Sequence, residues 1–228
     1  MRISFIRKTI IPVSEIPIFI IAYNQYTFVK NMVEQLQKYV SSNRIHILDN
    51  KSTYAPMVDY LISIESTVHV HRMDRNYGHK VINKIDTFTT SKKYIITDPD
   101  LTFNKNLPTN FISTLEFISD KYKSGKVGFA LDISSNVRLD VLYNGQNPIE
   151  WESQFWRNRI DNSDYELYAA DIDTTFCLIN KDYIGNTIRI AGNFTCIHRP
   201  WLIGWQDDIP KDELDFYKTN NISSCWIK

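Results

Sequence analysis

The first hundred residues alternate short apolar runs with amphipathic stretches, and this alternation constrains the fold more than any other feature. The apolar runs are rich in β-branched and aromatic side chains, which is typical of buried strands. They are residues 16–23, 44–49, 68–73 and 93–97. The stretches between them predict helices at residues 27–40, 54–65 and 79–91. Repeats of this kind give parallel strands joined by right-handed crossovers, so we predict an α/β fold.

The second half of the chain begins in the same way and then becomes irregular. Residues 110–125 predict an amphipathic helix and residues 126–134 a strand. From about Val137 the sequence is polar and aromatic with weak periodicity, until residues 173–180 again predict a strand. We expect one domain over residues 1–228, with a first functional half at about 14–104 and a second at about 105–228.

The composition is that of an ordinary globular chain without a basic excess. Hydrophobic residues make up 43% and charged residues 23% of the 228 positions, so disorder is not expected. Lysine plus arginine and aspartate plus glutamate balance at 26 each. Nucleic-acid binders normally carry a basic surface that replaces phosphate counterions, so this balance disfavours a nucleic-acid partner.

Cysteine content and the N-terminal sequence predict a soluble, cytoplasmic protein. Three cysteines are an odd and sparse set, which fits a reducing compartment better than a disulfide framework. Charged residues and prolines interrupt the apolar runs of the first 25 positions. We therefore expect neither a transmembrane segment nor a signal peptide.

Polar residues follow directly on each of the first four predicted strands. The carboxyl ends of parallel strands share one edge of the sheet, where open α/β sheets bind their ligands. The residues at this edge are Tyr23, Asn24 and Gln25, then Asp49 to Ser52, then Asp74 to Gly78, and finally Asp98 and Asp100. Their convergence predicts a binding crevice.

The segment Asp98-Pro99-Asp100 has two interpretations. Aspartate and proline both favour turns, so the segment can simply reverse the chain. Two aspartates flanking one residue can also bind Mg²⁺ or Mn²⁺, because hard cations take oxygen ligands. Such an ion neutralises a departing diphosphate as a Lewis acid. The position after a fourth strand favours the metal site, with Asp100 as the stronger ligand and Pro99 as a rigid spacer.

Several other strand-end residues suit a nucleotide. Asp49 can accept a hydrogen bond from a pyrimidine N–H, with Tyr23 as a stacking or hydrogen-bonding partner, although Asp49 can equally belong to a helix N-cap. Arg75 can hold a phosphate in bidentate fashion. Gly78 allows close backbone approach to a ligand, or it serves only a turn.

Four motifs in this order resemble the nucleotide-sugar half of a GT-A fold glycosyltransferase. They are IFIIAYNQ, ILDNKST, RNYGHK and YIITDPDL, and they cover roughly the first half of the chain. The later IDTTF and HRPW are similar to segments of small glycosyltransferase domains of large DNA viruses. A viral member of that group would work in the host-cell cytoplasm.

The resemblance implies a fold and a reaction. The fold is GT-A, a Rossmann-like and mainly parallel mixed sheet flanked by helices, with an irregular acceptor-side C-terminal half. The reaction transfers a sugar from a nucleotide-diphosphate sugar, with a UDP-sugar expected, to a hydroxyl acceptor on a glycan or another molecule. The implied cofactor is Mn²⁺ or Mg²⁺.

The same resemblance implies roles for individual residues. Binding of the nucleotide sugar falls on Tyr23, Asn24, Asp49, Arg75, Asn76, Gly78 and Asp98. Metal binding falls on Asp100, Asp98 and His198. Contacts to the acceptor fall on Trp151, Glu152, Trp156 and Thr174. Asp173 would be the general base for the attacking hydroxyl, a role typically worth ~10²–10⁴ in rate.

The sequence departs from larger family members in having no clear Glu-Asp base motif. The identity of the base and the stereochemical outcome therefore stay open, and Asp171, Asp207 and Asp208 are alternative bases. The segment around the last two, residues 207–218, is most simply the capped and solvated start of a helix. Cys177 is expected in the core of a buried strand.

Three other functions fit parts of the sequence. A sugar-nucleotide pyrophosphorylase would need a glycine-rich loop after the first strand, and AYNQYTF contains no glycine. A metal-dependent nuclease could use the paired aspartates but would need a basic cluster. A non-catalytic carbohydrate- or partner-binding module with a vestigial nucleotide site is the main alternative.

Overall fold

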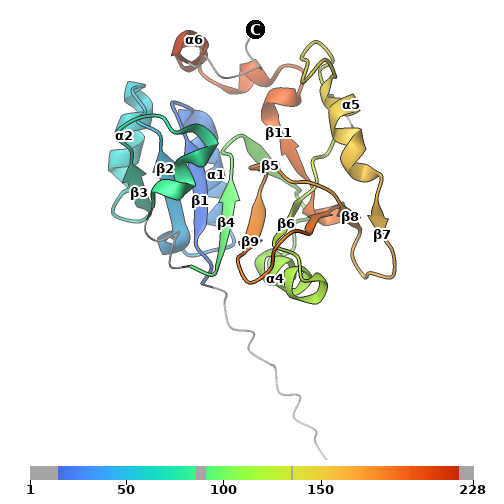
Figure 1. Ribbon diagram of the computed structural model, residues 1–228. Helices are drawn as coiled ribbons and strands as arrows, with labels where there is room; N and C mark the ends of the chain where they lie inside the picture. The colour runs from blue at the N-terminus through green and yellow to red at the C-terminus, as the bar shows by residue number, and fades with distance from the viewer. Residues whose placement is uncertain (1–14, 86–90, 135, 221–228) are drawn as a thin grey trace, which may run out of the picture.

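One nine-stranded mixed sheet runs through the computed structural model, which describes residues 15–85, 91–134 and 136–220 (Figure 1). The strand order is β3-β2-β1-β4-β9-β6-β10-β8-β7, and a separate pair is formed by β11 and β5. The strands are β1 (Ile18–Ala22), β2 (Ile45–Asp49), β3 (His69–Arg72), β4 (Lys93–Thr97), β5 (Leu101–Phe103), β6 (Lys126–Phe129), β7 (Arg159–Ile160), β8 (Leu167–Ala169), β9 (Cys177–Asn180), β10 (Thr187–Ile190) and β11 (Cys196–His198).

The first half is the predicted parallel sheet. β1 pairs in parallel with both β2 and β4, and β2 pairs in parallel with β3. The helices α1 (Tyr26–Leu36) and α2 (Ala55–Ile64) supply the first two crossovers. The mixed α/β fold class predicted from the alternation is thereby confirmed.

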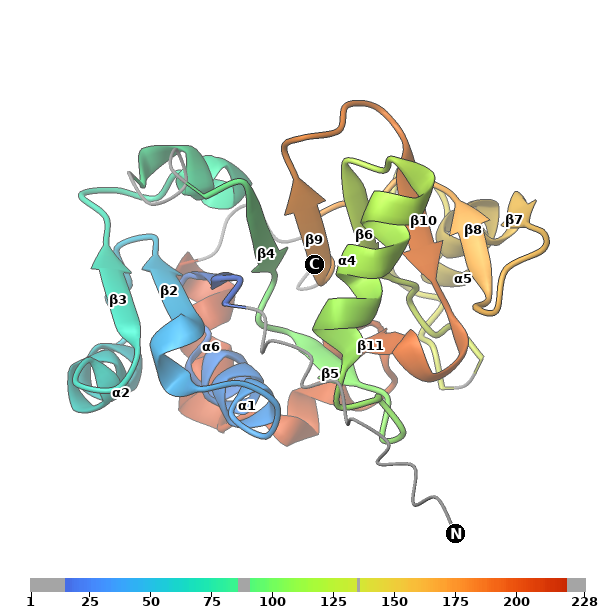
Figure 2. The ribbon, with the colours of Figure 1, turned by 90° about the horizontal axis from the view of Figure 1, so that it is seen from below.

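Both faces of β1 are covered, which explains why this strand is a continuous apolar run. Ile18 and Ile20 of β1 face a core that contains α1, α2 and α4 (Phe111–Tyr122). Phe19 and Ile21 face the opposite layer, which is covered by the short 3₁₀ segment η2 (Gly78–Lys84). Figure 2 shows α1 and α2 on one side of the strands, with the green η2 segment on the other.

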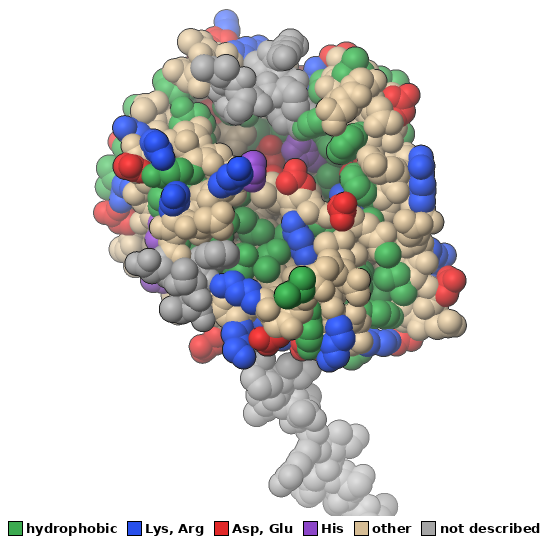
Figure 3. Space-filling view, viewed as in Figure 1, with side chains coloured by type: hydrophobic (Ala, Val, Ile, Leu, Met, Phe, Trp, Pro, Cys, Tyr) green, Lys and Arg blue, Asp and Glu red, His purple; other side chains and the backbone are tan. Residues whose placement is uncertain are grey.

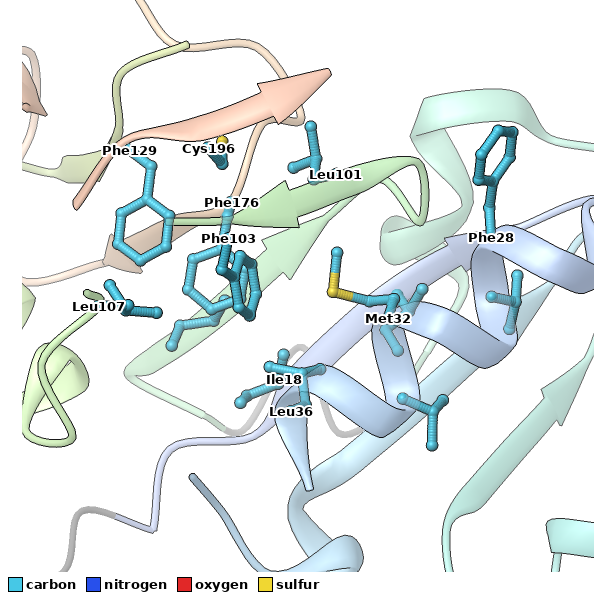
Figure 4. Close-up of a cluster of buried hydrophobic side chains, with 14 of the residues drawn as sticks. Ile18, Phe28, Met32, Leu36, Leu101, Phe103, Leu107, Phe129, Phe176 and Cys196 are labelled. Carbon is cyan, nitrogen blue, oxygen red and sulfur yellow. The ribbon is translucent and has the colours of Figure 1, made fainter. Parts of the chain in front are cut away.

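The main core is centred on a cluster of aromatic rings to which β5, β6 and α4 each contribute a phenylalanine (Figure 4). Phe129 and Phe176 stack with their ring centroids 4.8 Å apart, and Phe103 meets Phe176 edge-on at 5.1 Å. Phe111 of α4 contacts both Phe129 and Phe176. Aromatic pairs of this kind hold the first and second halves of the chain in one core.

β9 is the single antiparallel strand at the centre of the sheet, between β4 and β6. The strand predicted at 173–180 is shorter in the structure, where only residues from Cys177 onward pair with the neighbouring strands. Cys177 is fully buried, as expected. Gly128 allows this close approach, since a Cβ there would meet the Cys177 Cβ at 2.6 Å.

Other boundaries differ from the sequence predictions. The predicted helix at 79–91 is the 3₁₀ segment η2 over its first part, and residues 86–90 of that prediction lie outside the described residues. The strand predicted at 126–134 ends at Phe129. α5 (Pro148–Ser153) was not predicted; its N-cap residue is Asn147, whose side chain forms a capping box with Glu150.

The last described helix, α6 (Lys211–Asn220), returns to the first half of the molecule (Figure 1). Its Glu213 accepts hydrogen bonds from the backbone N–H of Thr27 at 2.9 Å and from the Thr27 hydroxyl at 2.6 Å. Glu213 is only 2% exposed, so the prediction of a solvated helix start is wrong at this residue. No helix among the described residues is long and apolar enough to cross a membrane.

Candidate functional site

A cleft of about 950 Å³ opens at the carboxyl ends of β1 and β4. Its walls come from the loops after the parallel strands on one side and from α5, β10 and β11 on the other. Figure 3 shows it as a hollow in which acidic and histidine side chains gather. It is the crevice that the strand-end residues predicted.

The floor of the cleft is the bend Asp98-Pro99-Asp100 between β4 and β5. The backbone N–H of Asp98 donates to the carbonyl of Thr174 at 2.9 Å, and the Thr174 hydroxyl donates to the Asp98 carboxylate. The carbonyl of Asp100 accepts from the backbone N–H of Arg199 at 2.8 Å. The bend is thus held from two later segments of the chain.

Asp100 and His198 meet because of strand register. β11 pairs with β5 so that His198 lies opposite Leu101, the residue after Asp100. The His198 Nε2 atom is 3.4 Å from one carboxylate oxygen of Asp100. The other oxygen, Oδ1, is buried and has no hydrogen-bond partner among the described residues, and the whole residue is 6% exposed.

This carboxylate fits a bound cation, because a buried oxygen without a donor carries a large desolvation cost. The described residues contain no group of three or more His, Cys, Asp or Glu side chains arranged to hold a metal ion. A cation here would contact the Asp100 carboxylate, with His198 beside it. Mg²⁺ sites of this type complete their coordination with substrate phosphates and water.

The electrostatics of the floor also favour a positive charge. Burial and the neighbouring Asp100 carboxylate raise the pKa of Asp98 above its usual range, and the hydrogen bond from Thr174 opposes this rise. Two carboxylates one residue apart repel each other unless a cation lies between them. The cleft is thus acidic at its floor before any ligand binds.

The side of the cleft formed by the loops after β1, β2 and β3 is lined by Tyr23, Asn76 and Gly78, three of the residues expected to bind a nucleotide, and by Gln25 and Asn50. The Asn50 side chain accepts from the backbone N–H of Tyr77 at 3.0 Å and donates to the Gly78 carbonyl at 3.3 Å. Gly78 adopts a φ of +58°, a conformation that favours glycine. The Asn50 side chain therefore joins the loop after β2 to the loop after β3.

Three residues expected to bind the nucleotide do not line the cleft, and the structure gives each another role. Asn24 is 1% exposed, and its side-chain oxygen accepts from the backbone N–H groups of Thr53 and Tyr54. Asp49 accepts from the N–H of Ser52 at 2.9 Å. The Arg75 guanidinium lies 4.8 Å from the ring centroid of Tyr77. Asn24 and Asp49 brace the loops, so we place them outside the contact surface.

The opposite side of the cleft carries an aromatic wall. Trp151 lines the cleft as predicted, and Tyr143 stacks on it with the ring centroids 6.1 Å apart. Trp201 meets Tyr143 edge-on and lies 4.9 Å from the His198 ring. Trp156, in contrast, packs on Tyr168 in a separate small cluster and does not line the cleft.

Glu152 lines the cleft but is also half of a buried ion pair. It is 1% exposed and contacts the guanidinium of Arg189, which is 3% exposed. Burial raises the pKa of Glu152, and the contact with Arg189 opposes this rise. Removing one partner of such a pair leaves the other charge buried and uncompensated.

Asp173 is exposed and lines the cleft on a segment that cationic side chains hold by its backbone. The Lys126 ammonium donates to the carbonyl of Asp173 at 2.8 Å, and the Arg189 Nε donates to the carbonyl of Asp171 at 2.7 Å. Asp171 also lines the cleft, whereas Asp207 and Asp208 do not. Thr174 faces Asp98 rather than the cleft.

Sequence reasoning missed several lining residues. Trp201 belongs to the HRPW segment, so the sequence carries a signal for it. Arg189 and Tyr143 stand in short or irregular segments with no motif around them. Tyr217 reaches the cleft from α6, where its hydroxyl accepts from the Gln25 side chain at 3.1 Å.

Comparison with known proteins bears on the fold. No family model and no curated protein matches the chain. Among solved structures, it is similar to the mannosyltransferase PcManGT of Pyrobaculum calidifontis in complex with GDP-Man and Mn²⁺, with a TM-score of 0.50 and 10% identity. The similarity covers 90% of this chain and 59% of that one, so the chain spans less than two thirds of its length.

A second similarity, to HddC of Yersinia pseudotuberculosis complexed with GMP-PN, has a TM-score of 0.48 and 14% identity. It covers 88% of this chain and 97% of that one, and at this score it adds no argument. The likeness to the mannosyltransferase, together with the sheet order, confirms the predicted Rossmann-like glycosyltransferase fold of the GT-A type.

Proposed function

We propose that the protein is a metal-dependent glycosyltransferase that moves a sugar from a nucleotide-diphosphate sugar to a hydroxyl acceptor. One observation carries the proposal. The buried Asp100 carboxylate, with one oxygen lacking a donor among the described residues, lies at the floor of a large cleft between polar loops and an aromatic wall. A divalent cation and a diphosphate match that charge pattern.

In this proposal, one side of the cleft binds the donor and the other side binds the acceptor. Residues at about 14–104 bind the donor, with Tyr23, Asn76 and Gly78 on the nucleotide. Residues at about 105–228 bind the acceptor, with Trp151 against a sugar ring. Asp100 and His198, with Asp98 beside them, would hold Mn²⁺ or Mg²⁺, which neutralises charge on the departing diphosphate.

Asp173 is the proposed general base. Its carboxylate is exposed within the cleft, and its backbone is fixed by Lys126, so it can accept the proton of an attacking hydroxyl. Asp171 stays the alternative because it borders the same cleft. A UDP-sugar is the expected donor, and the complex of the similar mannosyltransferase with GDP-Man makes GDP-sugars the second class to test.

The first test measures thermal unfolding with UDP, GDP and their sugars, each with Mn²⁺ or with EDTA. A nucleotide sugar should raise the unfolding midpoint of the wild type only with Mn²⁺, because a ligand at 100 times its Kd stabilises by about 2.7 kcal/mol. Asp100→Asn should lose this Mn²⁺-dependent shift and the Mn²⁺-dependent hydrolysis of the donor.

Asp164→Asn is the matched control, since Asp164 is exposed and does not border the cleft. It should behave as the wild type. A shift that survives EDTA or the Asp100 substitution would contradict the metal site. A chain that binds no nucleotide in this panel would instead point to a non-catalytic binding module.

The second test concerns Asp173. Asp173→Asn should lower kcat by ~10²-fold or more while the donor Kd stays within about two-fold of the wild type, since a general base acts on the chemical step. Asp171→Asn is the comparison at the same edge. If donor affinity falls as much as turnover, or if Asp171→Asn has the larger effect on kcat, Asp173 is not the base.

A further inference from the structure

A second cavity of about 620 Å³ borders the acceptor side of the cleft. The two hollows share three residues, Gln154, Phe155 and Asp171, which we call the ridge. We propose that this cavity binds the outer sugar units of a neutral oligosaccharide acceptor, whose reacting end lies in the cleft. The inference rests on the proposed function and specifies its acceptor as an oligosaccharide rather than a single sugar.

The ridge is held in place by Arg189. The Arg189 Nε donates to the Asp171 carbonyl at 2.7 Å, and its guanidinium carbon lies 4.0 Å from the ring centroid of Phe155. The Gln154 amide donates to the carbonyl of Trp151 at 2.7 Å. Because Arg189 is itself anchored by Glu152, both hollows are preformed, as ligand sites usually are.

The ridge lies directly beside the proposed reaction centre. Asp171 precedes the proposed base Asp173 by two residues, and two residues span at most ~7 Å of chain. A monosaccharide whose hydroxyl meets Asp173 stays within the cleft. A longer acceptor that leaves the cleft on this side crosses the ridge and enters the second cavity.

The lining of the second cavity selects a neutral, polyhydroxylated ligand. Its aromatic rings are Tyr122 and Phe155, and its hydrogen-bonding side chains are Asn158, Asn186 and Thr187 together with the Gln154 and Asp171 of the ridge. Amides, hydroxyls and a carboxylate offer the donors and acceptors that sugar hydroxyls need. No lysine, arginine or histidine is among the described residues that border it, so a phosphate or another anion finds no cationic partner.

The experiment uses the full chain and an array of neutral oligosaccharides of glucose, mannose and N-acetylglucosamine with one to six units. Ala169→Trp fills the cavity, because Ala169 is an exposed residue of β8 that borders it. The pair Asn158→Ala and Asn186→Ala removes hydrogen-bonding groups without adding bulk. Ile62→Trp is the control, since Ile62 is 54% exposed and borders neither hollow.

We expect binding by the wild type and by Ile62→Trp to strengthen with glycan length. Ala169→Trp should lose ten-fold or more affinity for glycans of three or more units, and the double alanine variant should lose several-fold. Binding of single sugars and Mn²⁺-dependent donor hydrolysis should be unchanged in all variants. The thermal midpoint of each variant checks that it is folded.

The outcomes separate the two proposals. Binding that does not depend on length, or that survives Ala169→Trp and the double variant, overturns the oligosaccharide inference even if donor hydrolysis is present. Length-dependent binding that Ala169→Trp abolishes, in a chain without donor hydrolysis, supports the cavity and overturns the transferase function. A chain that shows neither donor hydrolysis nor length-dependent glycan binding overturns both proposals.

Discussion

Asp98 and Asp100 are separated by one proline and yet have different surroundings. Asp98 accepts a hydrogen bond from Thr174, whereas one oxygen of Asp100 is buried without a donor among the described residues. Burial and the Asp100 charge raise the pKa of Asp98. The pair therefore costs stability in the absence of a ligand, which is common at functional sites.

A prediction follows for Asp98→Asn. The substitution keeps an oxygen that can accept from Thr174 and removes one of two repelling charges, so the free energy of unfolding in EDTA should rise by about 1 kcal/mol at neutral pH. The same variant should bind a nucleotide sugar with Mn²⁺ more weakly. Urea unfolding and the thermal-shift panel measure the two effects, and a loss of stability in EDTA would contradict the reasoning.

The sequence predicts where single site residues lie along the sheet, but it predicts only part of what their side chains contact. The strand-end rule placed Tyr23, Asn24 and Asp49 at the correct edge, but it could not say which of them faces the cleft. Asn24 and Asp49 turn inward because unpaired backbone N–H groups of the following loop need acceptors. That choice depends on tertiary hydrogen bonds, which a single sequence does not encode locally.

At the scale of elements, the neighbouring strands β2 and β3 carry a histidine cluster formed by His46, His69 and His71. His46 lies opposite His69 in the parallel register, with ring centroids 4.5 Å apart, and its Nδ1 is 3.0 Å from the Nε2 of His71. His46 is 8% exposed and also contacts the ring of Phe19. Burial lowers the pKa of His46 to about 4, and repulsion from His69 and His71 adds to this effect.

The cluster predicts a loss of stability in acid. The unfolded chain binds a proton at His46 near pH 6.5 and the folded chain only near pH 4, so stability falls as the pH drops through this window. The loss attributable to His46 should reach up to about 3 kcal/mol. Urea midpoints at pH 7.5, 5.5 and 4.5 measure it.

His46→Phe keeps a ring against Phe19 and should flatten this pH dependence. His79→Gln is the comparison, because His79 is exposed and lies outside the cluster. A wild-type slope that survives His46→Phe would assign the acid sensitivity to other groups.

Among the elements, the long apolar strands were predictable and the short ones were not. β1, β2 and β4 are mainly apolar because both of their faces are buried. β7 has two residues, and β5, β8 and β11 have three each, too few to show a period. They form because a neighbouring strand supplies their hydrogen bonds, which is tertiary information.

At the scale of the whole molecule, the last described helix, α6, supplies the hydrogen-bond acceptor at the N-terminus of α1. The N-cap residue of α1 makes no side-chain capping bond, and Glu213 of α6 instead accepts from the N–H and hydroxyl of Thr27. A carboxylate at a helix N-terminus also interacts favourably with the helix dipole. The Tyr54 hydroxyl donates to Asp212 at 2.7 Å and adds a second link to α6.

Glu213→Ala tests this connection. The variant leaves the N–H of Thr27 without its acceptor and should cost about 1–2 kcal/mol of unfolding free energy. The thermal midpoint should fall by roughly 2–8 °C for a chain of this size. Glu213→Gln keeps one acceptor oxygen and should lose less. An unchanged midpoint in the alanine variant would mean that α6 does not stabilise α1.

The insertion of β9 has a consequence for how the chain is made. β4 and β6 do not pair with each other, so the sheet is completed only when β9 enters between them. Residue 177 follows residue 97 by 80 positions, which at ~5–20 residues per second leaves β4 without that neighbour for roughly 4–16 s on the ribosome. During this interval β4 is an open apolar edge that can template aggregation. Because β4 gains this neighbour only from residue 177 onward, a nascent chain released before that residue should be a substrate for chaperones.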